Sequence, residues 1–260
     1  MKINNTTIKN IILKKRNIFI FIIILISLIN SSYQGGGCQQ NKFSGRIPET
    51  HLKKMIDDLN SKRQSLANGK VTGLDKKSFP QSSNMSKIFW NKELEKIAQN
   101  WANRLVEECK FEHNPIRKFD SMNKEIALGE NLYISSTTKK VTKDNMGKAF
   151  IDANNSWWNE KDDFNVEEFS SFKSSSLKVV GHFTQMAWAE TVAIGCGYAL
   201  YKDDKFTSNE IVVCNYIKSG NYKGKPIYLA GKPCTKCLIG NCNTNLPGLC
   251  GGNGYYSKGN

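Results

Sequence analysis

The sequence predicts an α+β fold in which helices pack against an antiparallel sheet. Three observations support this class: three segments carry apolar residues at helical spacing, three others are rich in β-branched and aromatic residues, and a short polar loop joins the last two strands. Helices together with an antiparallel sheet favour a sandwich over βαβ winding. A length of 260 residues allows one fair-sized domain and additional segments.

Residues 1–37 are predicted to be a secretory signal peptide and the start of the mature N-terminus. Five basic residues precede a 12-residue apolar run, 18–29, and small and polar residues follow. An uncleaved anchor is the alternative, but a spanning helix needs about 20 apolar residues. We therefore expect a secreted, extracellular protein without stable membrane insertion. Removal of this segment lowers the net charge from +14 to +9.

The positive charge does not predict a nucleic-acid partner. The lysines are scattered along the chain, and no basic stretch is interleaved with aromatic residues. A basic surface suits anionic glycans or membranes, but a solubilising surface is the simpler interpretation.

Three amphipathic helices are expected, over residues 51–69, 90–109 and 145–160. Asn68 and Gly69 end the first of them. The apolar stripes consist of Leu52, Met55, Ile56 and Leu59; of Leu94, Ile97, Ala98, Trp101 and Leu105; and of Phe150, Ala153 and Trp157. We interpret Trp101, Trp157, Trp158 and Trp188 as core residues rather than as a ligand platform.

Strands are expected at residues 125–135, 191–201 and 210–217, with a polar loop of hairpin length at 203–209. Residues 167–176 are predicted to be an exposed polar loop. Cys196 and Cys214 lie on the two hairpin strands, where adjacent antiparallel backbones can bring them within disulfide distance.

Two histidines and two acids occur in separate short motifs. His113 ends CKFEH, Glu130 follows glycine in GENLY, Glu160 ends WWNE and His182 begins HFTQMAW. Imidazole and carboxylate groups are ligands that Zn²⁺ accepts, and they can also act as general acid and base. The alternative is a buried hydrogen-bond network that holds a helix to the sheet. His51, on a lysine-rich helix, is given a structural role.

The motifs GHFTQMAW, IGCGYA, VVCNYIKSGNYKG, GENLY and CKFEHN occur in this order, and with them the chain resembles the CAP superfamily from about residue 46 to residue 250. This superfamily contains cysteine-rich secretory proteins, antigen 5 allergens and pathogenesis-related proteins. The chain is most similar to the venom-allergen-like, activation-associated secreted proteins of parasitic nematodes. The resemblance implies a three-layer α-β-α sandwich at 46–220, with an open cleft, and a short disulfide-rich, hinge-like tail at 221–260.

The resemblance also implies a site and a function. His113, Glu130, Glu160 and His182 would converge in the cleft, and His113 and His182 would ligate an optional Zn²⁺. The implied function is a secreted, parasite-released protein that binds a lipid or sterol, a divalent metal or a host protein and modulates the host response. A metal-dependent hydrolase, protease-like or lipase-like, is the alternative. No serine or cysteine stands out as a nucleophile beside either histidine, which disfavours an enzyme.

All eight cysteines follow residue 37, and an even number in an exported chain favours disulfides. The tail spacing C-x₂-C-x₄-C-x₇-C would also suit zinc, but export favours disulfides here too. The resemblance implies Cys196–Cys214, Cys234–Cys242 and Cys237–Cys250. Cys109 lacks its usual family partner, so we predict a Cys38–Cys109 pair. Asn84 and Asn154 lie in glycosylation sequons.

Overall fold

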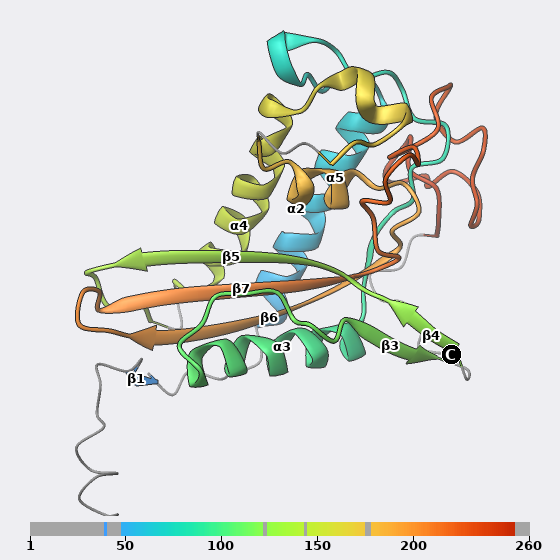
Figure 1. Ribbon diagram of the computed structural model, residues 1–260. Coiled ribbons are helices and arrows are strands. Elements are labelled where there is room, and N and C mark those ends of the chain that lie inside the picture. Colours follow the sequence, from blue (N-terminus) through green and yellow to red (C-terminus); the bar gives the residue numbers. More distant parts are fainter. Residues whose placement is uncertain (1–38, 41–47, 122–123, 143–144, 175–177, 253–260) are drawn as a thin grey trace, which may run out of the picture. The chain divides into compact units, whose positions relative to one another are not determined.

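The computed structural model describes residues 39–40, 48–121, 124–142, 145–174 and 178–252 (Figure 1). The helices are α2 (Glu49–Ala67), α3 (Lys92–Glu107), α4 (Gly147–Asn159) and α5 (Gly181–Ala187), with short 3-10 helices η1 (Leu74–Lys76), η2 (Glu160–Asp163) and η3 (Val166–Ser170). The strands are β1 (Gln39–Gln40), β2 (Phe89–Trp90), β3 (Lys118–Ser121), β4 (Lys124–Ala127), β5 (Gly129–Thr137), β6 (Ala193–Lys202) and β7 (Ser208–Ile217).

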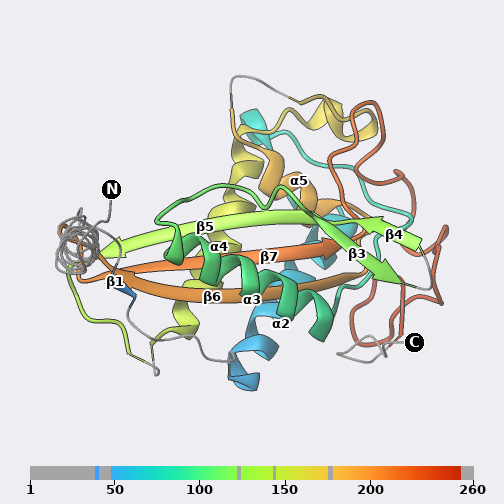
Figure 2. The same ribbon diagram turned by 60° about the horizontal axis from the view of Figure 1, so that its bottom comes forward.

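A central sheet has the strand order β1-β6-β7-β5, and β2 pairs with β6 in parallel. Strands β6 and β7 form the predicted hairpin, in which Cys196 lies opposite Cys214 and is bonded to it. Strand β5 runs antiparallel to β7 and places Glu130 opposite Asn215. Strands β3 and β4 form a separate two-stranded ribbon beside the N-terminal end of β5 (Figure 2).

Helices cover both faces of the sheet, which confirms the α-β-α sandwich. Helix α3 lies against one face, and α2, α4 and α5 lie on the other (Figure 1). A Cβ atom at Gly197 would lie 2.4 Å from backbone atoms of Gln99, so glycine allows α3 to pack directly on β6. The largest apolar cluster fills the opposite side, between the sheet and the other helices.

An arginine that has no carboxylate partner in the described part of the chain lies inside this larger core. Arg63 of α2 is fully buried, and its guanidinium donates hydrogen bonds to the carbonyl oxygens of Ser86, Met186 and Trp188. Burial lowers the pKa of Arg63 from 12.5 to about 9. The planar guanidinium thereby joins α2 to the segment before β2 and to the C-terminal end of α5.

The three long helices lie close to their predicted ranges, and the four tryptophans that we interpret as core residues are buried. Two predictions of local structure are wrong in part. The predicted strand at 125–135 is two strands, because β4 pairs with β3 up to Ala127 and β5 then pairs with β7 from Gly129. Most described residues of the segment 167–176 are exposed, as predicted, but the segment contains η3, and Phe172 is buried against Trp188. Helix α5 was not predicted.

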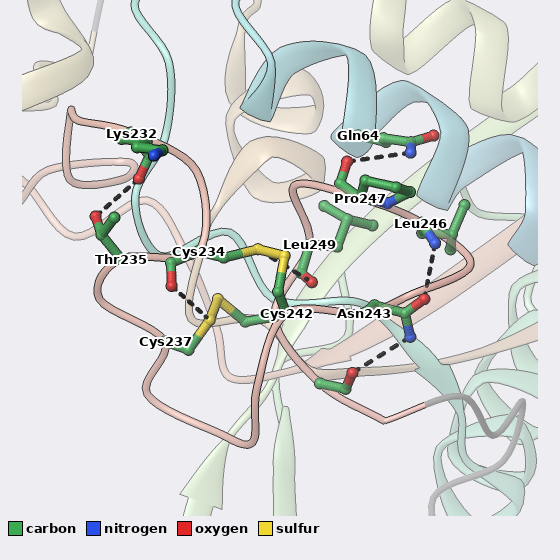
Figure 3. The surroundings of a disulfide bond; sticks show 12 residues. Gln64, Lys232, Cys234, Thr235, Cys237, Cys242, Asn243, Leu246, Pro247 and Leu249 are labelled. Atoms are coloured by element: carbon green, nitrogen blue, oxygen red, sulfur yellow. Dashed lines mark hydrogen bonds between the residues drawn. A yellow bond between two sulfur atoms is a disulfide. The ribbon is translucent and has the colours of Figure 1, made fainter.

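The cysteine-rich tail packs against the rest of the domain and does not form a separate compact unit. It contains the disulfides Cys234–Cys242 and Cys237–Cys250, as predicted (Figure 3). Backbone hydrogen bonds join Cys250 to Met85 and to Lys87, and both Gln64 and Asn68 donate to the carbonyl oxygen of Pro247. The tail is therefore anchored to α2 and to the segment before β2.

Three sequence predictions concern residues 1–38, which lie outside the described residues: the signal peptide, the start of the mature chain and the cysteine partner of Cys109. Cys109 itself is disulfide-bonded. No helix in the described ranges is both long enough and apolar enough to cross a bilayer.

The glycosylation prediction is wrong for both sequons. Asn84 and Asn154 are buried. The side-chain oxygen of Asn84 accepts a hydrogen bond from the amide of Leu229, and the side-chain nitrogen of Asn154 donates to the carbonyl oxygen of Met55 and to Asp58. A glycan on either nitrogen would have to occupy the packed core, so these asparagines act as internal hydrogen-bonding residues.

Candidate functional site

An open cleft of about 650 Å³ lies at the end of the sheet where β5 begins. Its walls come from the loop after α3, the β3–β4 ribbon, the start of β5, helix α5 and the loop after β7. His113, Glu130 and His182 all line this cleft, and Glu160 lies behind His182. The structure thus brings together residues that are up to 69 positions apart in the sequence.

His182 is held by Glu160. The Nδ1 atom of His182 lies 2.6 Å from Oε1 of Glu160, and the other carboxylate oxygen accepts hydrogen bonds from the backbone amides of His182 and Phe183. Those amides belong to the first turn of α5, whose N-cap residue Val180 offers no side-chain acceptor. Glu160 therefore supplies from another element the cap that Ser or Asp usually supplies locally.

A tryptophan fixes the other side of the His182 ring. The rings of Trp157 and His182 are stacked at an interplanar angle of 26°, with centroids 6.0 Å apart. The indole nitrogen of Trp157 donates to the carbonyl oxygen of Leu132 on β5, so the tryptophan is itself tied to the sheet. Neighbouring residues of α4 and η2 thus position His182, since Glu160 follows Trp157 by three residues.

His113 is held by Glu130 in a corresponding arrangement. The Nδ1 atom of His113 lies 2.8 Å from Oε1 of Glu130, which also accepts the backbone amide of Asn114. The second oxygen of Glu130 accepts from the side chain of Asn215 on the paired strand β7. A buried carboxylate on the sheet thereby holds a loop histidine whose side chain is 50% exposed.

The two histidines present the same atom for binding. Since each Nδ1 is within hydrogen-bond distance of a carboxylate, the tautomer with a proton on Nδ1 is favoured and Nε2 carries the lone pair. Neither Nε2 has a hydrogen-bond partner among the described residues. This donor set suits a divalent transition metal, with His113 and His182 as ligands and the glutamates as their supports.

The cleft does not form a closed metal cage. Within the described ranges, ligand atoms of three or more His, Cys, Asp or Glu residues come within 4.8 Å of one another only at Cys234, Cys237 and Cys250, and all three are disulfide-bonded. A cation bound by His113 and His182 would keep open coordination positions toward the cleft.

Several residues that shape the site were not identified from the sequence. Asn131 donates to the carbonyl oxygen of His182, and Asn215 supports Glu130. Gln185 of α5 accepts the amide of Gly220 and lies so close to β5 that a Cβ atom at Gly129 would come within 2.1 Å of its oxygen. The available signal was a polar residue within an apolar strand or helix, as with Asn215 in VVCNYI.

The described lining residues offer no activated nucleophile. Ser219 is the serine among them, and its hydroxyl donates to the carbonyl oxygen of Gly220 rather than to a histidine. The arrangement is suited to holding a ligand or cation in a cleft lined by two imidazoles, each of which is hydrogen-bonded to a glutamate.

Comparisons with known proteins identify relatives of this chain in sequence and in fold. Residues 56–216 match the model of the cysteine-rich secretory protein family. Scoloptoxin SSD976 of Scolopendra dehaani is 35% identical over 232 residues, which cover 89% of this chain and 96% of the toxin. The structure of BmVAL-1 is similar with a TM-score of 0.65 and 30% identity, covering 82% of this chain and 98% of that chain. NaASP2, solved with Zn²⁺, has a TM-score of 0.62 and 31% identity, covering 83% of this chain and 100% of that chain.

Proposed function

The chain belongs to the cysteine-rich secretory protein family, and we propose that it is a secreted, non-enzymatic binding protein whose cleft binds a divalent metal through His113 and His182. The observation that carries the proposal is the pair of histidines that line one cleft. Each has Nδ1 within hydrogen-bond distance of a glutamate and Nε2 without a partner among the described residues. The solved structure of the relative NaASP2 with Zn²⁺ supports zinc as the metal to test first.

Export is part of the proposal. Three disulfides join described residues, and the venom relative scoloptoxin SSD976 covers nearly the same length. Disulfides persist in oxidising compartments, which supports an extracellular protein. Outside the cell, the ligand that reaches the open cleft would be a lipid, a sterol or a protein of the host, and the metal would be an additional ligand of the same surface.

Zinc titration by isothermal calorimetry, on the purified and oxidised protein without an affinity tag, tests the metal site. The parent protein is expected to bind one zinc ion. His113→Ala and His182→Ala should each weaken binding by at least about tenfold, because a site with two protein ligands loses half of them. His51→Ala is the matched control, since His51 lies on α2 and is not among the lining residues of the cleft.

Glutamine variants of the two glutamates test whether these acids support zinc binding by orienting the histidines, which remain as the zinc ligands. In Glu130→Gln or Glu160→Gln, the amide can present N–H to Nδ1, which then accepts and leaves the proton on Nε2. Zinc affinity should fall by about 10–100-fold although both histidines remain. Unchanged affinity in both glutamine variants, or equal loss in His51→Ala, would refute the proposed site.

A further inference from the structure

The cysteine-rich tail presents an exposed aliphatic tip. Leu238 and Ile239 are 60% and 54% exposed, and they lie in the short loop between Cys237 and Cys242. Neighbouring large aliphatic side chains at such a tip are not explained by the core, by the cleft or by contacts within the tail. The tip lies outside the metal site, because no tail residue beyond Tyr222 lines the cleft.

The loop that carries the tip is held at both ends. Cys237 is bonded to Cys250 and Cys242 to Cys234, and the amide of Gly251 donates to the carbonyl oxygen of Asn241. Just before the loop, the amide of Lys236 donates to the carbonyl oxygen of Ser83, which lies in the segment before β2. Figure 3 shows the two disulfides side by side, with Asn243 bonded to Leu246 just beyond them. The loop therefore cannot turn inward to bury its aliphatic side chains without breaking these bonds.

The stretch of sequence that contains the tip carries charge of one sign. Residues 211–260 contain six lysines and no aspartate or glutamate. Lys232 and Lys236 are exposed and come shortly before the tip, and no carboxylate lies within ion-pair distance of either among the described residues. The surface that meets this tip must therefore accept aliphatic side chains and also carry negative charge.

We propose that the tail is a docking surface for an anionic lipid bilayer, with Leu238 and Ile239 entering the interfacial region and Lys232 and Lys236 contacting acidic headgroups. A bilayer satisfies both requirements at once. A protein partner fits less well, because a stable protein interface needs about 800 Å² on each side and usually a packed apolar centre, whereas a loop tip with two aliphatic side chains offers neither.

Vesicle co-sedimentation of the secreted, oxidised protein tests the proposal. The probes are vesicles of phosphatidylcholine alone and vesicles with one part phosphatidylserine to three parts phosphatidylcholine. The parent should bind the mixed vesicles more tightly. Leu238→Ser/Ile239→Ser should weaken this binding by at least about tenfold, and Lys232→Gln/Lys236→Gln by about fivefold for each lysine removed.

The matched controls make the same kinds of substitution at exposed positions outside the tail. Leu74→Ser/Ile116→Ser removes two exposed aliphatic side chains outside the tail, and Lys139→Gln/Lys140→Gln removes two exposed lysines after β5. Both controls should bind mixed vesicles like the parent. All variants share the same N-terminal sequence, so a difference among them reports the tail.

A fluorescence measurement tests the depth of the tip directly. Tryptophan emission of Leu238→Trp should shift to the blue on mixed vesicles, and emission of Ile116→Trp should not. Three results would overturn the proposal: no binding of the parent to mixed vesicles, equal binding by the tip variant, or equal binding of the parent to vesicles without phosphatidylserine.

Discussion

The two histidine–glutamate pairs of the cleft use the same hydrogen bond in different structural settings. His182 is 24% exposed and Glu160 15%, and their partners are the first turn of α5 and the ring of Trp157. His113 is 50% exposed, whereas Glu130 is fully buried in the sheet. In the first pair the histidine belongs to a packed helix; in the second it belongs to a surface loop that the glutamate holds in place.

Because of this difference, the contribution of each pair to metal binding can be separated from its contribution to the stability of the fold. Each pair orients one imidazole toward the cleft, so both are expected to contribute equally to metal binding. Only the Glu160 pair also completes a helix end inside the core, where Phe183 is fully buried. We therefore expect substitutions in the two pairs to have similar effects on zinc affinity and unequal effects on the free energy of unfolding.

The largest expected effect is that of Glu160→Ala. This substitution removes the acceptor for two backbone amides and for Nδ1 of His182. Loss of a cap costs about 1–2 kcal/mol, and a partly buried donor left without a partner adds about 1 kcal/mol. The free energy of unfolding should fall by about 2–3 kcal/mol in chemical denaturation at neutral pH.

Glu130→Ala is the matched substitution in the other pair. Its backbone partner, Asn114, lies on a loop that can turn to water, and the side chain of Asn215 keeps its hydrogen bond to the carbonyl oxygen of Gly129. The loss in unfolding free energy should therefore be about 1 kcal/mol. Local opening should increase instead, and hydrogen exchange of the Asn114 amide should become faster. An equal loss of stability in both variants would contradict the structural contrast.

Substitution of the histidines should show a smaller contrast with the same sign. His182→Ala removes a hydrogen bond to a carboxylate and the stacking contact with Trp157, and should cost about 1–2 kcal/mol. His113→Ala removes a contact of a half-exposed side chain and should cost less than about 0.5 kcal/mol. Thermal unfolding in the presence of a chelator measures these differences without any contribution from bound metal. A larger loss for His113→Ala would reverse the comparison.

The sequence predicts the class of fold and the main helices because their apolar spacing is regular. It does not predict helix α5, since seven residues are too few to show a period and its cap comes from Glu160. Phe172 lies in a polar segment, yet it packs against Trp188 from a distant part of the chain. Asn84 and Asn154 match a surface modification pattern, but long-range hydrogen bonds place both in the core.

In the site, too, local sequence patterns predict the residues, whereas their pairing depends on long-range contacts. The motifs identify the histidines and acids, and the resemblance groups them. Which acid supports which histidine depends on contacts that the sequence does not encode locally: Glu130 faces the loop of His113 because β5 pairs with β7, and Glu160 faces α5 because α4 ends beside it. The supporting role of Asn215 follows from the same strand register.

A third glutamate is only partly buried, and its hydrogen-bond donor is a tyrosine instead of a histidine. Glu210 of β7 accepts a hydrogen bond from the hydroxyl of Tyr198, and Asp152 and Lys148 of α4 are its charged neighbours. Burial raises the pKa of Glu210 above its usual value of 4.5. Between 4.5 and the raised value the unfolded chain loses its proton first, so stability falls as the pH rises through this window.

Glu210→Gln should therefore have the smallest effect and the opposite sign. The amide oxygen can still accept from Tyr198 but carries no charge, so the variant should be more stable than the parent at neutral pH by less than about 1 kcal/mol. The difference should disappear below pH 4.5, where both side chains are neutral. Denaturation at the two pH values, with the exposed Glu167→Gln as control, measures it. A loss of stability at neutral pH would mean that the charged form of Glu210 is stabilised by Lys148, and a half-buried acid would then need no histidine to remain charged.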